Sequence, residues 1–236
     1  MRRLATLFST LVNACLAALV VSVVLPGPHR VLIPEAYGLT EIAPRVWTDE
    51  PGDASRLAGL ARTARANVAA FFGDDPPRPT LVLCTTRACA SDFGVGGNGL
   101  SVADMAILVS PGGLTTGTLT HEMTHARLHR RMGPASILRQ PYPTWFDEGL
   151  ATFVADHPVW RGEIAPRHRA RVRRVERFWQ WDDAFRDLGV GRAYRAAAAE
   201  VAAIDEALGR EGLLTLIADA EAGADFDAAL AGRLSR

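Results

Sequence analysis

The chain has 236 residues, 48% of them hydrophobic, so it can bury a core and is short enough for one main domain with a small appendage. Its 26 basic and 26 acidic residues give a formal net charge of zero, which offers no electrostatic basis for binding nucleic acid.

The N-terminus carries the features of a membrane segment. Arg2 and Arg3 precede an apolar run over residues 4–25. A helix of about 20 apolar residues spans a bilayer, and basic residues before it favour the cytoplasmic side. We therefore predict that residues 1–25 form a single-pass anchor in the cell membrane, with the rest of the chain outside the cytoplasm. The alternative is a cleaved signal peptide and a secreted protein, but Pro26-Gly27-Pro28 stands where a small-residue cleavage site is expected.

Residues 26–37 are predicted to be a linker without helical or strand periodicity, and residues 38–236 the main domain. The first predicted element of the domain is a helix over 53–72, which ends at Gly73. Two β-rich runs follow at 79–84 and 105–110, and the glycine-rich stretch 94–99 between them is predicted to be a flexible turn. In an oxidising compartment Cys84 and Cys89 can pair; the alternative is two free buried thiols.

The next predicted helix opens at Ser110, stops at Gly133 and carries two histidines four positions apart. On an α-helix His121 and His125 project from one face, one turn apart, so both imidazoles can reach one Zn²⁺. Glu122 then lies beside the metal, where a carboxylate can accept a proton from an activated water.

A second helix is predicted from Thr144, as its cap, through Val154, and it carries Glu148. Further helical patterns cover 192–209, 211–220 and 226–234. The arginine-rich segment 161–177 is interpreted as a solvated helix face; contact with anionic lipid or with an acidic substrate is the alternative.

The segments that carry His121, His125 and Glu148 resemble the gluzincin zinc metallopeptidases, and in particular small bacterial peptidase MA-like domains. Residues 121–125, HEMTH, match the H-E-x-x-H motif of the first zinc helix, and residues 145–151, WFDEGLA, match the W-x-x-E-G-x-A segment of the second. The resemblance implies that Glu148 is the third ligand of one zinc ion per chain, beside His121 and His125, and that Glu122 is the general base. It also implies an α+β fold over about residues 46–230, in which a small antiparallel or mixed sheet packs on the zinc helix and a helical C-terminal part follows.

The resemblance suggests further roles. By similarity to the aminopeptidase N family, Tyr194 in the segment RAYRAAAA is the candidate oxyanion donor, with His157 as the alternative. The run 105–110 is expected to be the edge strand above the metal, where an extended peptide can bind. His129 is interpreted as a solvated residue. The candidates for contact with the zinc ligands are Asp147, Thr152 and Asp156.

The sequence thus predicts a membrane-anchored, extracytoplasmic zinc peptidase that acts on a peptide or protein substrate. No G-x-M-E-N-like amine-binding motif precedes His121, so an endopeptidase or a processing enzyme is favoured over an aminopeptidase. The alternative is a non-catalytic, zinc-containing gluzincin fold that serves as a peptide-binding or structural module of a membrane complex. The intact Glu122 argues against that alternative, because a purely structural zinc site has no use for a base.

Overall fold

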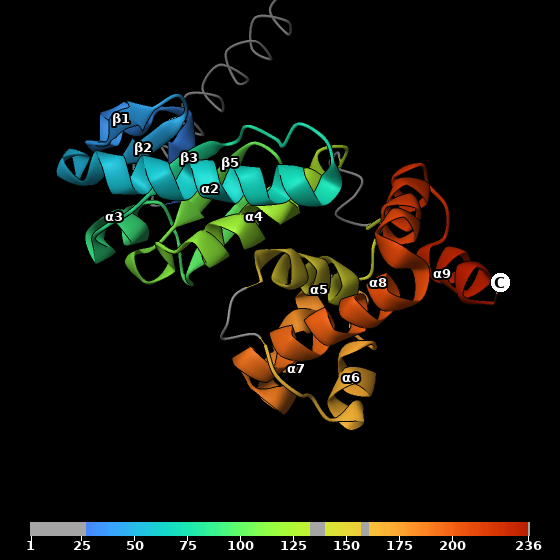
Figure 1. Cartoon of the computed structure of the whole chain (residues 1–236). Coiled ribbons are helices and arrows are strands. Elements are labelled where there is room, and N and C mark those ends of the chain that lie inside the picture. Colours follow the sequence, from blue (N-terminus) through green and yellow to red (C-terminus); the bar gives the residue numbers. More distant parts are fainter. Residues whose placement is uncertain (1–26, 133–139, 157–160, 236) are drawn as a thin grey trace, which may run out of the picture.

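The computed structural model describes residues 27–132, 140–156 and 161–235 of the chain. This part contains one five-stranded mixed sheet and eight α-helices (Figure 1), which confirms the predicted α+β class. Within these ranges no helix combines the length and apolar character needed to cross a bilayer. The predicted membrane segment, residues 4–25, falls outside the ranges described.

The sheet has the strand order β1-β2-β3-β5-β4. Its strands are β1 (Thr40–Ala43), β2 (Val46–Thr48), β3 (Thr80–Leu83), β4 (Gly99–Val102) and β5 (Ala106–Val109). In this order β1 and β4 form the two edges. The β2, β3 and β5 strands are parallel to one another, and each edge strand pairs antiparallel with its neighbour.

The prediction that residues 105–110 form the edge strand is wrong. That run becomes β5, an interior strand between β3 and β4, and all four of its residues are buried. The edge beside it is β4, which begins at the last residue of the stretch predicted to be a turn. An uninterrupted apolar run such as 106–109 is typical of a strand whose two faces are both buried, as in the interior of a parallel sheet. That feature of the sequence favours an interior position.

Each face of the sheet is covered by different elements. The helices α2 (Ala54–Phe72) and α4 (Thr116–His129) share one apolar cluster with Leu81, Ile107 and other residues of one face. The other face, with Val82 and Leu108, packs on the short helix α3 (Arg87–Asp92) and on the chain before β1.

A second group of helices lies on the side of α4 away from the sheet (Figure 1): α5 (Thr144–Ala155) packs on α4, and α8 (Val190–Glu221) packs on α5. Close packing of α5 on α8 depends on Gly149, because a Cβ added there would lie 2.6 Å from the backbone oxygen of Ala197. The remaining helices are α6 (Pro166–Val172), α7 (Trp181–Leu188) and α9 (Phe226–Leu234).

Most helices lie where the sequence places them, and their ends follow local chemistry. The α2 helix matches its predicted range to within one residue and stops at Gly73, whose φ of 71° suits glycine. The α8 helix contains both predicted segments, 192–209 and 211–220, with non-helical backbone at Gly209 between them. The α4 helix is shorter than predicted at both ends: Thr115 caps its start, and it ends at His129 rather than at Gly133.

The segment predicted to be a linker without helical periodicity has local structure where it is described. Residues 28–32 and 34–37 form two 3-10 helices, and Arg30 bonds Asp92 of α3 at 3.1 Å. Cys84 and Cys89 form a disulfide, as the first of the two sequence interpretations proposed.

The arginine-rich segment 161–177 is largely paired with acids of this chain. Arg169 and Arg173 both bond the buried Glu200 of α8, at 2.5 and 3.0 Å, and Arg171 bonds Asp187 of α7. These contacts hold α6 on the other helices and support a structural role for the segment.

Candidate metal centre

The α4 helix carries His121, Glu122 and His125 through the middle of the molecule, and all three are buried. Two contacts fix its position there. Asn67 of α2 donates to the Thr120 hydroxyl at 3.2 Å, and Ser101 of β4 donates to the Glu122 carbonyl oxygen at 3.2 Å. The helix is therefore held from both its α2 side and its strand side at the turn that bears the first histidine.

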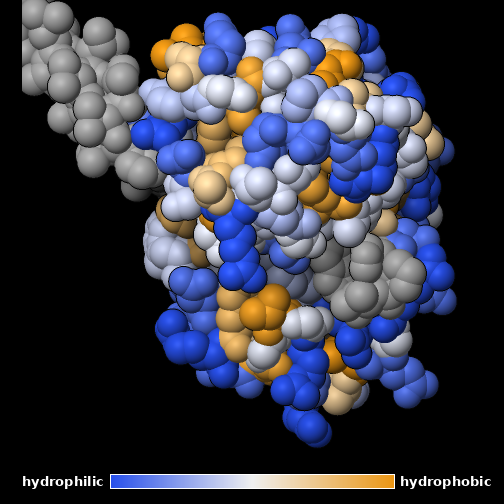
Figure 2. Space-filling model, turned by 90° about the vertical axis from the view of Figure 1, so that its left-hand side faces the viewer, coloured by the Kyte–Doolittle hydropathy of each residue, from blue (hydrophilic) through white to orange (hydrophobic). Residues whose placement is uncertain are grey.

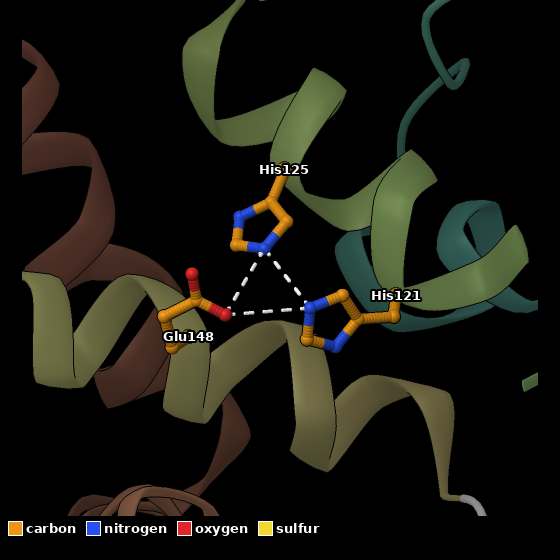
Figure 3. Close-up of side chains that lie close together, drawn as sticks. All are labelled: His121, His125 and Glu148. Carbon is orange, nitrogen blue, oxygen red and sulfur yellow. Dashed lines mark hydrogen bonds and ion pairs between the residues drawn. The ribbon is translucent and has the colours of Figure 1, made fainter. Parts of the chain in front are cut away.

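The α5 helix crosses α4 and brings Glu148 to the two histidines, and Figure 3 shows the three side chains pointing toward one another. The Nε2 atoms of His121 and His125 are 3.1 Å apart. Oε2 of Glu148 lies 3.4 Å from Nε2 of His121 and 3.5 Å from Nε2 of His125. A carboxylate 23 positions beyond His125 in the chain thus completes a compact triangle of three ligand atoms.

The triangle has the dimensions of a zinc site. Ligands at about 2.05 Å from a tetrahedral zinc are separated by roughly 3.3 Å, and the three observed separations bracket that length. Two imidazoles and one carboxylate also form a donor set typical of catalytic zinc, which leaves a fourth position open. The residues present therefore fit a zinc ion.

The charges within the triangle are strongly coupled. Burial tends to raise the pKa of Glu148, but the neighbouring His125 and His121 outweigh it and lower this pKa to about 2. Burial tends to lower the pKa of His125, but Asp147 and Glu148 outweigh it and raise this pKa well above its ordinary value.

Glu122 lies beside the triangle and outside it. Burial raises the pKa of its carboxyl, against the opposing charges of His121 and His125. The side chain rests against β4: a Cβ added to Gly99 would lie 2.6 Å from Oε1 of Glu122. A glycine at this position of the edge strand therefore leaves the space that the carboxylate occupies.

Asp147 and His129 form a second group behind His125. Oδ1 of Asp147 is 3.0 Å from Nδ1 of His125, and Oδ2 is 2.7 Å from Nε2 of His129. The interpretation of His129 as a solvated residue is wrong, because its side chain is only 21% exposed and is bonded to a buried carboxylate. Of the three candidates for contact with the ligands, Asp147 bonds His125, whereas Asp156 pairs with Arg161. Thr152 donates to the backbone oxygen of Glu148 at 2.7 Å.

Tyr194 of α8 lies at the same site, as its predicted role requires. Its ring meets the ring of His121 edge-on, with centroids 5.6 Å apart, and packs on Trp181 and Phe185. Burial raises the pKa of the Tyr194 hydroxyl, with a further contribution from Glu148, so the hydroxyl keeps its proton. The alternative donor, His157, lies outside the described residues.

A cavity of about 850 Å³ opens beside the three ligand atoms. Its walls include Glu122, Tyr194 and His129, together with Met105 before β5 and Phe178 after α6. Three of the residues at this site, His129, Phe178 and Gly99, were not predicted from the sequence, whereas Met105 belongs to the run 105–110 that was expected to lie above the metal. A signal for His129 did exist, since it follows His125 by four positions and so shares its helical face.

Comparisons with protein-family models, with curated proteins and with solved structures found no match to this chain.

Proposed function

We propose that this protein is a zinc-dependent peptidase of the gluzincin type. The observation that carries the proposal is the triangle of His121, His125 and Glu148, with the separations of a tetrahedral zinc site and a buried carboxylate, Glu122, next to it. A structural zinc site is closed by four protein ligands, whereas the residues that the structure describes supply three here, and the site faces a cavity.

The proposed reaction is the hydrolysis of a peptide bond. Bound zinc would supply a Lewis acid and lower the pKa of a water molecule to about 7. Glu122 accepts the proton of the attacking water and passes it to the leaving amine, and burial, which raises the pKa of its carboxyl, makes it a stronger base than an exposed glutamate. Tyr194, protonated and next to His121, donates a hydrogen bond to the oxyanion of the intermediate.

The shape of the cavity favours an extended peptide as substrate. The β4 strand is an edge of the sheet and Gly99, Leu100 and Ser101 line the cavity, so a substrate can add to the sheet through main-chain hydrogen bonds. Apolar side chains also line it: Met105 is 60% exposed and Phe178 is 53% exposed. On the face shown in Figure 2, hydrophobic residues form separate patches in a largely hydrophilic surface. These two residues favour a substrate with a bulky apolar side chain near the scissile bond.

The proposed location is outside the cytoplasm, attached to the membrane through residues 4–25. The disulfide between Cys84 and Cys89 supports an oxidising compartment, because such bonds are rare in the cytosol.

The proposal is tested with the full-length protein in detergent, by elemental analysis and by mass spectrometry of a peptide library. We expect about one zinc per chain, cleavage of library peptides by the wild type, and loss of cleavage in Glu122→Gln with zinc content unchanged. A wild type that binds zinc but cleaves nothing would favour the non-catalytic alternative. A fully active Glu122→Gln would refute the assignment of Glu122 as the general base.

A further inference from the structure

The carboxylate of Asp147 joins two histidines of α4. One of its oxygens bonds Nδ1 of His125 at 3.0 Å and the other bonds Nε2 of His129 at 2.7 Å. The two rings are 5.6 Å apart and inclined by 32°, so they lie side by side on the helix and face the same carboxylate. Both oxygens of this buried group therefore have a histidine partner.

The bond to His125 sets which ring nitrogen can bind a metal. An ionised carboxylate only accepts hydrogen bonds, so Nδ1 of His125 must be the donor. The other nitrogen, Nε2, points into the triangle with His121 and Glu148. A carboxylate behind a metal-binding histidine fixes its tautomer and its ring orientation, and it makes the ring a better ligand.

The bond to His129 does not touch the metal-binding ring but holds the carboxylate that orients it. A carboxylate held at one oxygen can turn about its Cβ–Cγ bond, whereas a carboxylate held at both oxygens has one orientation. Asp147 also immediately precedes Glu148 on α5, so the same contact fixes the turn of α5 that bears the third ligand. The His129 side chain is partly exposed and its imidazole is not part of the triangle, so the hydrogen bond to Asp147 is its most direct polar link to the metal ligands.

We propose that His129 is a positioning residue of the metal centre, which acts through Asp147 on the orientation of His125. This inference rests on the proposed zinc site but not on the proposed peptidase activity. The competing arrangement is a second metal ion held by His125, His129 and Asp147, whose ligand atoms lie within 4.8 Å of one another. The 2.7 and 3.0 Å separations are hydrogen-bond lengths, and a second ion would require both nitrogens of the His125 ring at once.

The test is a double-mutant cycle on the zinc dissociation constant of the full-length protein, measured by competition with a chelator. The variants are His129→Leu, which removes the donor, His129→Gln, which keeps an N–H donor, and Asp147→Asn, alone and combined with His129→Leu. His168→Leu is the matched control, because His168 lies on α6 and lines no wall of the cavity.

We expect His129→Leu to weaken zinc binding by about tenfold, the lower end of the range for residues that contact a metal ligand. His129→Gln should recover most of that loss, and His168→Leu should bind as the wild type does. In the Asp147→Asn background, His129→Leu should cause no further loss, because the group through which it acts is already altered. The absorption spectrum of the cobalt-substituted protein should change in His129→Leu and return toward that of the wild type in His129→Gln.

Each other outcome has a separate meaning. Full affinity in His129→Leu, or additive losses in the double variant, would overturn the positioning role while leaving the zinc site intact. Two zinc ions per chain, one of them lost in His129→Leu, would replace it with a second metal site. A wild type without zinc would remove the proposed centre itself. Unfolding temperatures of the zinc-free proteins separate these effects from a loss of folding.

Discussion

Replacement of Gly99 by alanine gives a test of Glu122 that leaves both Glu122 and the three ligands in place. The added Cβ would lie 2.6 Å from Oε1, 2.8 Å from Cγ and 2.9 Å from Cδ of Glu122, and these are its three nearest atoms. Ordinary contact begins at 3.4 Å, so the carboxylate must move by roughly 0.8 Å. A misplacement of about 1 Å in a catalytic group can cost a factor of roughly 100, equal to about 2.7 kcal/mol of barrier.

We therefore expect Gly99→Ala to lower kcat/KM for a library-derived peptide by about 100-fold, with zinc affinity unchanged. Stability should stay within about 1 kcal/mol of wild type, since alanine also restricts the unfolded chain. Gly97→Ala is the matched control: it lies two residues away, and a Cβ there meets nothing within 4 Å. Equal activity of both variants and the wild type would refute the claim that the position of Glu122 against β4 matters for the reaction.

Three further predictions follow from the same contacts. Glu148→Ala should weaken zinc binding by about tenfold or more, measured by chelator competition, and undiminished affinity would exclude Glu148 as a ligand. The zinc-free protein should be most stable between about pH 4.5 and 6.5, measured by chemical denaturation across pH. Below that window the stabilisation from Glu148 is lost as pH falls toward its pKa of about 2, and above it the stabilisation from His125 is lost as pH rises through its raised pKa; a flat profile would contradict this coupling. Phe178→Ser should raise KM for peptides with a bulky apolar residue by about tenfold, since burial of such a side chain contributes about 1.5–3 kcal/mol. Val190→Ser, which alters an exposed residue outside the cavity, should leave KM unchanged.

Local patterns in the sequence predicted the elements that depend on near neighbours. The stripe of apolar residues at helical spacing and the glycine after it were enough to place α2, and Gly209 marked the break in α8. The pairing of His121 with His125 follows from helical geometry, because four residues make slightly more than one turn. The end of α4 was misplaced because Gly133 is a strong stop signal, whereas the helix already ends at His129.

Contacts between distant segments could not be derived in this way. Resemblance to a family suggested Glu148 as the third ligand, and only the crossing of α4 and α5 brings its carboxylate within 3.5 Å of the histidines. The edge strand was assigned to residues 105–110 by resemblance, because that run directly precedes the zinc helix. The order of the strands in the sheet places β4 at the edge instead. The contacts of Gly99 with Glu122 and of His129 with Asp147 could not be derived either, since each joins residues 18 or more positions apart. The four-residue spacing places His129 on the helical face of His125 but does not show its partner.

The sequence alone therefore determined the two helices that carry the candidate ligands, because helical periodicity and end signals act over a few residues. The tertiary structure decided the separations of the ligand atoms, the free edge beside them and the cavity that they face. These depend on how α4, α5, α8 and the sheet pack, and packing is set by contacts between side chains far apart in the chain.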